Sequence, residues 1–270
     1  MIKYYRINST NIACWVNTGD FDARKNNLVF IHGSGGNHSI WSHQYGRLHK
    51  KYNIAAVNLP GHGPSEGDGE RHIQNYGDWM KKILPALRLT KPVLVGHSLG
   101  AAIALDVALR YPSEIAGIVC IGGGMKMPVN PFMLEFLKTN PPEIPTEIVD
   151  MMCKFSLAKE NREKFSEPLR KSIALSRVDV LYGDLLACNE LDLSRDAAGI
   201  GIPAHIVCGA EDKMTPPDLS QALARQIGGA KLIIIEGAGH TVMLEKPSAF
   251  NQCLDQFAES VFPASNPLKN

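Results

Sequence analysis

The sequence predicts an α/β fold in which a mostly parallel sheet is flanked by helices on both faces. Short apolar runs that look like strands alternate with longer stretches of helical period, which is typical of such a sheet. The runs are continuously apolar rather than alternating, as expected for strands that are buried on both faces. They comprise residues 28–31, 54–57, 92–95, 115–121, 204–208 and 232–235.

Two further strands are expected before these six, which makes a sheet of eight. Residues 2–7 and 12–16 have strand character, and the polar run Asn8-Ser9-Thr10-Asn11 joins them. A short polar connection between consecutive strands favours an antiparallel hairpin. We place this hairpin at the edge of the sheet.

The alternation of strands and helices stops between two glycine-rich segments, residues 122–124 and 199–203. No strand pattern appears between them, and the spacing of Ile148, Met151, Met152 and Phe155 predicts an amphipathic helix. We therefore expect a helical cap inserted between strands six and seven. The predicted domains are a core formed by residues 1–124 and 199–270, and a cap formed by residues 125–198.

Five of the nine methionines lie in the predicted cap. The simpler interpretation is that they fill the interior of a small helical unit. The alternative is that some of them line an apolar substrate pocket, because flexible thioethers adapt to varied ligands. The candidate substrate-binding residues of the cap are Met125, Met151, Met152 and Phe155.

Composition limits the classes of partner. The chain has 270 residues, of which 44% are hydrophobic, so it can bury a sizeable core. Its 28 Lys and Arg against 27 Asp and Glu give a formal charge of +1, which favours neither nucleic acid nor an anionic membrane. We expect a small-molecule substrate, no nucleic-acid or membrane partner, and a monomer or homodimer.

Cysteine usage and the first residues indicate a cytoplasmic protein. The six cysteines form no C-x-x-C pair, which fits a reducing compartment. Residues 1–6 lack the apolar core of a signal peptide, and the longest apolar stretch is interrupted by His97, Ser98 and Asp106. We therefore expect neither export nor a membrane-spanning segment.

The most informative motif is Gly96-His97-Ser98-Leu99-Gly100. A strand-like run leads into it and a helix-like run leads out, as in a nucleophile elbow. Such a sharp turn exposes the serine hydroxyl, and the two glycines let neighbouring backbone pass close by. We predict that Ser98 is a nucleophile.

A serine nucleophile needs a base, and the base needs an acid that fixes its tautomer. Asp212 and His240 each follow an apolar run, so both are expected at the carboxyl ends of parallel strands, where open α/β sheets build their sites. We predict that His240 is the base and Asp212 the acid. Glu211 and Asp218 are the alternatives for the acid.

Acyl transfer also needs two backbone N–H groups that bind the developing oxyanion. One is expected from Leu99, directly after the nucleophile, and the other from Ser34 in the glycine-rich loop 32–36. His97 is interpreted as a packed or hydrogen-bonded neighbour, and it is grouped with Gly33 among the residues that border the substrate. The histidines show no metal-ligand spacing, so neither a metal nor an organic cofactor is expected.

With these residues assembled, the chain resembles the α/β-hydrolase superfamily, in the group with a helical lid between the sixth and seventh strands. One departure is Asn58, where relatives often carry Asp, but a serine mechanism does not need that carboxylate. The motifs that carry the resemblance are His32-Gly33, Leu59-Pro60-Gly61-His62-Gly63-x-Ser65, the elbow at Ser98, Gly209-x-x-Asp212-x-x-x-Pro216, and Gly239-His240 followed by Glu245-Lys246-Pro247.

The resemblance implies a carboxylesterase-like serine hydrolase that cleaves small to medium acyl esters through an acyl-enzyme on Ser98. Haloalkane dehalogenases and epoxide hydrolases are similar but place Asp at the elbow. The loop 32–36 also resembles the His-Gly-Ser-Gly-Pro loop of C–C bond hydrolases of ring-cleavage products, with Gly36 in place of the proline. Such a hydrolase, a thioesterase or acyltransferase, and a non-catalytic ligand receptor are the alternatives.

Overall fold

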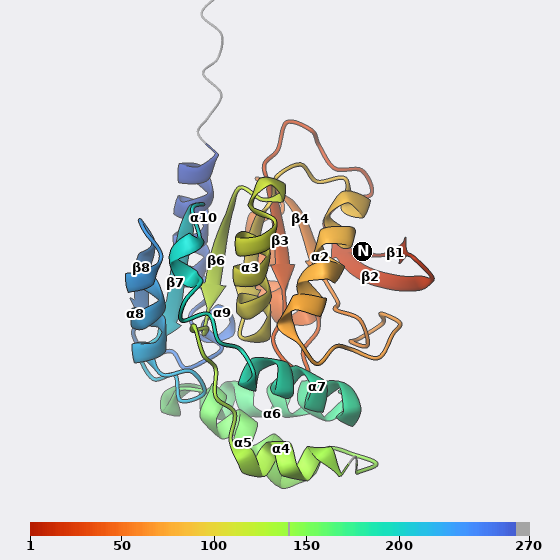
Figure 1. The fold of residues 1–270 in the computed structure, drawn as a ribbon, viewed down its shortest axis with the longest axis vertical. Coiled ribbons are helices and arrows are strands. Elements are labelled where there is room, and N and C mark those ends of the chain that lie inside the picture. Colours follow the sequence, from red (N-terminus) through yellow and green to blue (C-terminus); the bar gives the residue numbers. More distant parts are fainter. Residues whose placement is uncertain (140, 263–270) are drawn as a thin grey trace, which may run out of the picture.

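An eight-stranded sheet forms the centre of the computed structural model, which describes residues 1–139 and 141–262 (Figure 1). The strand order is β1-β2-β4-β3-β5-β6-β7-β8. This sheet confirms the predicted eight-stranded α/β fold. The strands are β1 (Ile2–Ile7), β2 (Thr10–Val16), β3 (Asn27–Ile31), β4 (Asn53–Val57), β5 (Val93–His97), β6 (Gly117–Ile121), β7 (Ala204–Gly209) and β8 (Lys231–Ile235).

The two N-terminal strands form the expected antiparallel hairpin at the sheet edge. Strand β2 also pairs antiparallel with β4, and every other pairing in the sheet is parallel. The turn is shorter than the predicted four residues, because Ile7 pairs with Thr10 and only Asn8 and Ser9 connect the strands. Asn8 has a φ of +56°, a conformation that Asn tolerates better than most residues.

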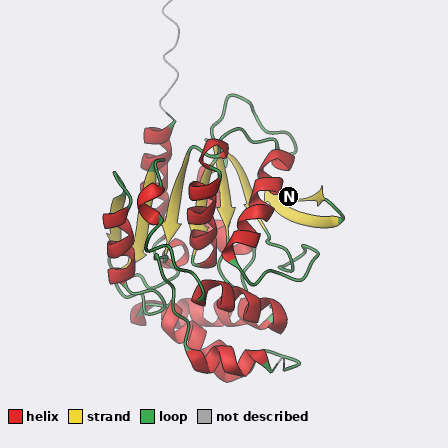
Figure 2. Cartoon of the chain, viewed as in Figure 1, coloured by secondary structure: helices red, strands yellow, loops and turns green. Residues whose placement is uncertain are grey.

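Helices cover both faces of the sheet (Figure 2). Each strand contributes side chains to both faces because successive side chains point to opposite sides of the sheet. In β3, Val29 and Ile31 belong to one hydrophobic cluster, and Leu28 and Phe30 belong to the other. The first face is covered by α2 (Ile73–Leu87), α3 (Leu99–Arg110) and α8 (Pro217–Gln226), and the second by α1 (Ser42–Leu48), α9 (Val242–Glu245) and α10 (Pro247–Val261).

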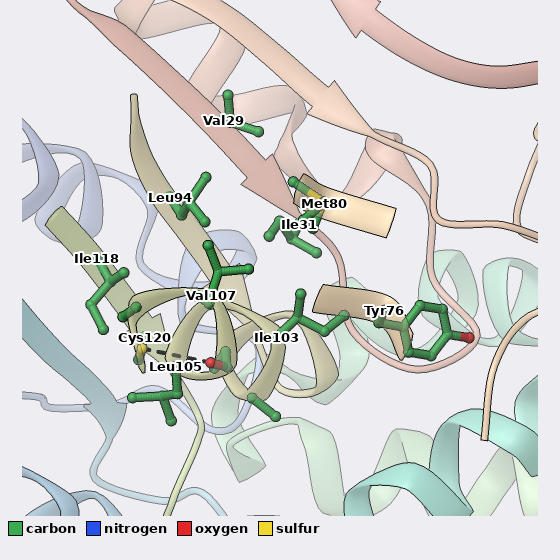
Figure 3. Close-up of a cluster of buried hydrophobic side chains, with 14 of the residues drawn as sticks. Val29, Ile31, Tyr76, Met80, Leu94, Ile103, Leu105, Val107, Ile118 and Cys120 are labelled. Atoms are coloured by element: carbon green, nitrogen blue, oxygen red, sulfur yellow. Dashed lines mark hydrogen bonds between the residues drawn. The ribbon is translucent and has the colours of Figure 1, made fainter. Parts of the chain in front are cut away.

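Helix α3 is largely apolar, and residues 99–108 are all buried, including Asp106, which pairs with Arg110. A helix of this kind needs neighbours all round, and α3 has the sheet on one side and α2 on another. Figure 3 shows Ile103 and Val107 of α3 among side chains of the strands and of α2. The small side chains of its first turn let the helix begin close against β5 and β6, directly after Ser98.

The chain between β6 and β7 forms the helices α4 (Pro131–Lys138), α5 (Thr146–Ser156), α6 (Arg162–Ala174) and α7 (Val178–Asn189). They have their own hydrophobic cluster, which includes Met133, Ile148 and Leu181. Figure 1 shows these helices beyond the edge to which the parallel strands point. We call residues 125–198 the α4–α7 segment; its standing as a separate cap domain remains a prediction.

The predicted amphipathic stripe of Ile148, Met151, Met152 and Phe155 lies on α5. Ile148 and Met152 are buried, and Met151 and Phe155 are half-buried. Among the described residues, no helix combines the length and apolarity needed to cross a membrane. All six cysteines are free thiols in buried positions.

Candidate active site

Ser98 stands on a sharp turn between β5 and α3. Its φ of 53° and ψ of −114° are unusual for a residue with a side chain. The surrounding backbone holds this conformation: the Ser98 amide donates to the carbonyl of Ile121 at 2.8 Å, and the Ser98 carbonyl accepts from Ala101 and Ala102. The turn therefore has the geometry that the motif predicts.

The two glycines of the motif are required by close backbone contacts. A Cβ on Gly96 would lie 2.0 Å from the carbonyl oxygen of Gly100. A Cβ on Gly100 would lie 2.2 Å from the carbonyl oxygen of Ile31. Neither position can carry a side chain without moving the main chain of β5, α3 or β3.

Asp212 and His240 are joined at the carboxyl ends of β7 and β8. Nδ1 of His240 donates to Oδ2 of Asp212 at 2.8 Å, and both side chains are buried. The amide and hydroxyl of Thr215 also donate to this carboxylate. Burial alone would raise the pKa of Asp212, but attraction to His240 and these hydrogen bonds hold it below its usual value.

The alternative acids do not contact His240. Oε2 of Glu211 accepts a hydrogen bond from the amide of Lys159 at 3.3 Å. Asp218 is an exposed residue in the first turn of α8. Of the three candidates, only Asp212 is positioned to hold the His240 imidazole.

His97 supports the backbone of His240. Its Nε2 donates to the carbonyl of His240 at 3.0 Å. Burial, and then the charge of His240, lower the pKa of His97 to about 3, so its imidazole is neutral at physiological pH. This contact agrees with the interpretation of His97 as a hydrogen-bonded neighbour.

Glu245 stabilises the His240 loop in a way that the sequence reasoning did not foresee. Its buried carboxylate accepts hydrogen bonds from the amide of Gly239 at 2.9 Å and the hydroxyl of Thr241 at 3.0 Å. It also accepts from the amide of Ala158 and the side chain of Asn161. Glu245 therefore ties the loop to the residues that follow α5.

The glycine-rich loop after β3 lies beside the elbow. A Cβ on Gly33 would be 3.1 Å from Cβ of Ser98. His32 fixes the start of the loop: its Nδ1 donates to the Gly33 carbonyl at 2.8 Å, and its Nε2 accepts from the amide of Leu59 at 3.1 Å. Burial keeps the pKa of His32 well below its usual value, which agrees with this neutral tautomer.

The two predicted oxyanion donors lie on either side of this contact. Leu99 is the first residue of α3, so its amide has no acceptor within the helix. The Ser34 amide belongs to the loop, and none of the described residues accepts a hydrogen bond from it. Neither amide therefore donates a hydrogen bond within the described residues, and their role as oxyanion donors remains a prediction.

A cavity of about 270 Å³ lies between the strand ends and the α4–α7 segment. Ser98, His240 and residues 32–37 form one side of it. Lys213 is the one residue in its lining that is a Lys, Arg, Asp or Glu. Most of the apolar wall comes from the α4–α7 segment: Met127, Val129, Met133, Met151, Met152, Phe155, Leu169, Ile173 and Leu185.

Most of the predicted substrate-binding residues border this cavity, namely Gly33, His97, Met151, Met152 and Phe155. Met125 is not among the residues that line it. Its side chain packs against the main hydrophobic core, and its carbonyl accepts from the amide of Leu193. Met127, two residues further along, lines the cavity and is also a buried member of that core.

Sheet and site together define an α/β-hydrolase: a serine at the β5–α3 turn, and a hydrogen-bonded Asp–His pair after β7 and β8. The family comparison agrees with this class. The chain belongs to the alpha/beta hydrolase family, whose model matches residues 28–252.

Several relatives are similar over most of the chain. The pimeloyl-[acyl-carrier protein] methyl ester esterase of Pectobacterium carotovorum is 25% identical and covers 88% of this chain and 96% of its own. The putative carbamate hydrolase RutD of Enterobacter cloacae is 25% identical, with 89% and 94% covered. The solved structure of a thermophilic esterase is 31% identical, with a TM-score of 0.82 and 97% and 98% covered. Family and relatives identify the protein as a hydrolase.

Proposed function

We propose that the protein is a serine esterase acting on small to medium acyl esters. The observation that carries this proposal is the hydrogen bond from His240 to Asp212, with His240 and Ser98 on the same wall of one cavity. An imidazole held in this tautomer leaves its Nε2 to accept a proton. The esterase names of two relatives support the choice of an ester bond.

In the proposed mechanism, His240 takes the hydroxyl proton of Ser98 while Oγ attacks the ester carbonyl. The amides of Ser34 and Leu99 donate to the oxygen that becomes negative in the tetrahedral intermediate. His240 then protonates the departing alcohol, and the acyl group stays on Ser98. Water repeats the sequence and releases the acid.

The cavity wall supports an apolar acyl group. Met127, Met133, Met151 and Met152 bring flexible thioethers to the wall, which can adapt to chains of different shape. A polar acyl group that contacts these methionines would lose its hydration and gain no hydrogen bond from their side chains. We therefore propose neutral, apolar acyl groups as the preferred substrates.

The test is hydrolysis of p-nitrophenyl esters by the wild type and by Ser98→Ala, together with labelling by a fluorophosphonate. We expect Ser98→Ala to lose at least about 1,000-fold in kcat and to resist labelling. Ser39→Ala changes an exposed serine and serves as the matched control. Equal turnover and labelling in Ser98→Ala would contradict the assignment. Acyl-CoA and a vinylogous diketo acid, tested in parallel, would reveal thioesterase or C–C bond hydrolase activity instead.

A further inference from the structure

A carboxylate from the α4–α7 segment is buried against the glycine-rich loop. Asp184 lies on α7 and is fully buried. Its Oδ2 accepts a hydrogen bond from the amide of Gly35 at 2.9 Å, and its Oδ1 accepts from the hydroxyl of Tyr76. A buried carboxylate is unfavourable unless it is hydrogen-bonded and paired with a positive charge. Gly35 and Tyr76 supply hydrogen bonds but no charge, so Asp184 needs a positively charged partner.

His62 supplies that charge. Its Nδ1 lies 2.9 Å from the carbonyl of Pro60, and its Nε2 lies 2.8 Å from Oδ2 of Asp184. Both partners are acceptors, so both ring nitrogens must carry a proton, and the imidazole is a cation. Burial opposes this charge, but attraction to Asp184 outweighs it and raises the pKa of His62.

The Gly35 residue is held on both sides by the α4–α7 segment. Its amide donates to Asp184, and its carbonyl accepts from the hydroxyl of Ser176, in the connection between α6 and α7. Gly35 has a φ of +62°, and a Cβ there would lie 3.1 Å from both Leu181 and Ser176. The helices therefore pack directly onto this turn of the loop.

The Gly33–Ser34 peptide contains the proposed oxyanion donor, and the Ser34–Gly35 peptide follows it. The Ser34 amide shares a peptide plane with the Gly33 carbonyl, which accepts from His32 and from the amide of Gly36. The bond from Gly35 to Asp184 fixes the following peptide plane. With both planes held, the Ser34 N–H keeps a single direction.

We propose that Asp184 is a positioning residue for the oxyanion hole. Its carboxylate holds the Ser34–Gly35 peptide so that the Ser34 amide is aimed at the developing oxyanion, and His62 cancels the charge that would otherwise repel that oxyanion. This inference rests on the proposed esterase function. It makes α7 part of the catalytic support as well as part of the pocket wall.

The test is Asp184→Asn, which keeps the shape of the side chain but removes the charge that pairs with His62. Asp179→Asn is the matched control, since Asp179 lies on the same helix with a half-exposed carboxylate paired to Arg177. Titration with a fluorophosphonate gives the concentration of competent sites. Per competent site, we expect Asp184→Asn to lower kcat about 10- to 100-fold with KM nearly unchanged, and Asp179→Asn to match the wild type.

A second measurement separates positioning from folding. An alkyl boronic acid forms a tetrahedral adduct with the serine and places an oxygen in the oxyanion hole. Its inhibition constant should rise in Asp184→Asn by about the same factor as kcat falls. A purely structural role would lower the melting temperature and the number of competent sites. It would leave kcat per competent site and the inhibition constant of the boronic acid unchanged, and that result would overturn the inference.

Ser176→Ala is a second variant that can be used if Asp184→Asn does not fold. It removes the hydrogen bond from the Ser176 hydroxyl to the Gly35 carbonyl and leaves the His62–Asp184 ion pair intact. We expect kcat to fall about 3- to 10-fold with KM unchanged, and an unchanged kcat would contradict the inference. A wild-type enzyme without Ser98-dependent turnover would contradict the proposed function and this inference together. An active wild type with a fully active Asp184→Asn variant would contradict the inference alone.

Discussion

Nε2 of His97 donates a hydrogen bond to the main-chain carbonyl of His240, and the two ring centres are 4.6 Å apart. The other edge of His97 lies against Gly33, where a Cβ would be 2.9 Å from its Nδ1. His97 therefore separates the glycine-rich loop from the His240 loop and supports both. The two imidazoles lie close together, yet only His240 contacts a carboxylate among the described residues.

His97→Gln is expected to make the free energy of unfolding less dependent on pH below pH 6.5. The pKa of His97 is about 3 in the folded protein and close to 6.5 when unfolded, so between these values only the unfolded chain binds the proton. Stability therefore falls as the pH drops from 6.5. Glutamine does not titrate. In the variant, the slope of the free energy of unfolding against pH should therefore be smaller by about 1.4 kcal/mol per pH unit between pH 4 and 6. Urea unfolding at several pH values measures it, with the exposed His43→Gln as control; an unchanged slope would be inconsistent with a neutral buried His97.

Gly96→Ala is expected to destabilise the fold severely. The new Cβ would lie 2.0 Å from the Gly100 carbonyl oxygen, so β5 and α3 would have to separate. We expect a loss of about 3 kcal/mol or more in the free energy of unfolding, or no soluble protein. Gly201→Ala is the control, because a Cβ there meets no atom within 4 Å. Its free energy of unfolding should change by less than about 1 kcal/mol. A Gly96→Ala variant as stable as this control would refute the backbone contact.

Glu245→Gln is expected to loosen the His240 loop. The carboxylate accepts from several donors, and a glutamine amide can replace it in only part of that network. Stability should fall by about 1–3 kcal/mol, and kcat should fall about tenfold. Thermal unfolding and ester hydrolysis measure the two effects. Glu236→Gln, at an exposed position in the same connection, should behave like the wild type.

Met151→Ala is expected to shift the chain-length preference. Met151 borders the cavity, so truncation opens room for a longer acyl chain. The ratio of kcat/KM for octanoate to that for butyrate p-nitrophenyl esters should rise about tenfold. Met125→Ala is the control, since Met125 is also half-buried but packs against the main core. A similar rise in the control would mean that the effect does not come from the cavity.

The fold was predictable because buried parallel strands have an unmistakable composition. The six apolar runs all became strands, with ends that differ from the predictions by at most two residues. The hairpin turn was harder, because Thr10 and Asn11 are polar residues typical of turns. Both are drawn into β2 by pairing with Ile7 and Arg6, and tertiary pairing overrode their local preference.

The strand-end residues of the site were predictable for a topological reason. Parallel strands bring their carboxyl ends to one edge, so Ser98, Asp212 and His240 could be expected together before any contact was known. The roles of these residues remain predictions. Contacts made by the α4–α7 segment could not be foreseen, because they depend on how the helices pack. Asp184 is one of two acids in a largely apolar helix, and nothing local to it points to Gly35.

The origin of the cavity wall has a consequence for engineering. Most of its apolar side chains come from one continuous stretch, residues 127–188, whereas Ser98, Asp212 and His240 are spread over three strand ends. A single exchange of that stretch would therefore transplant most of the wall at once and leave these three residues in place. A donor segment would have to bring its own equivalents of Asp184 and Ser176. Without them the new pocket would sit over a loop that has lost its support.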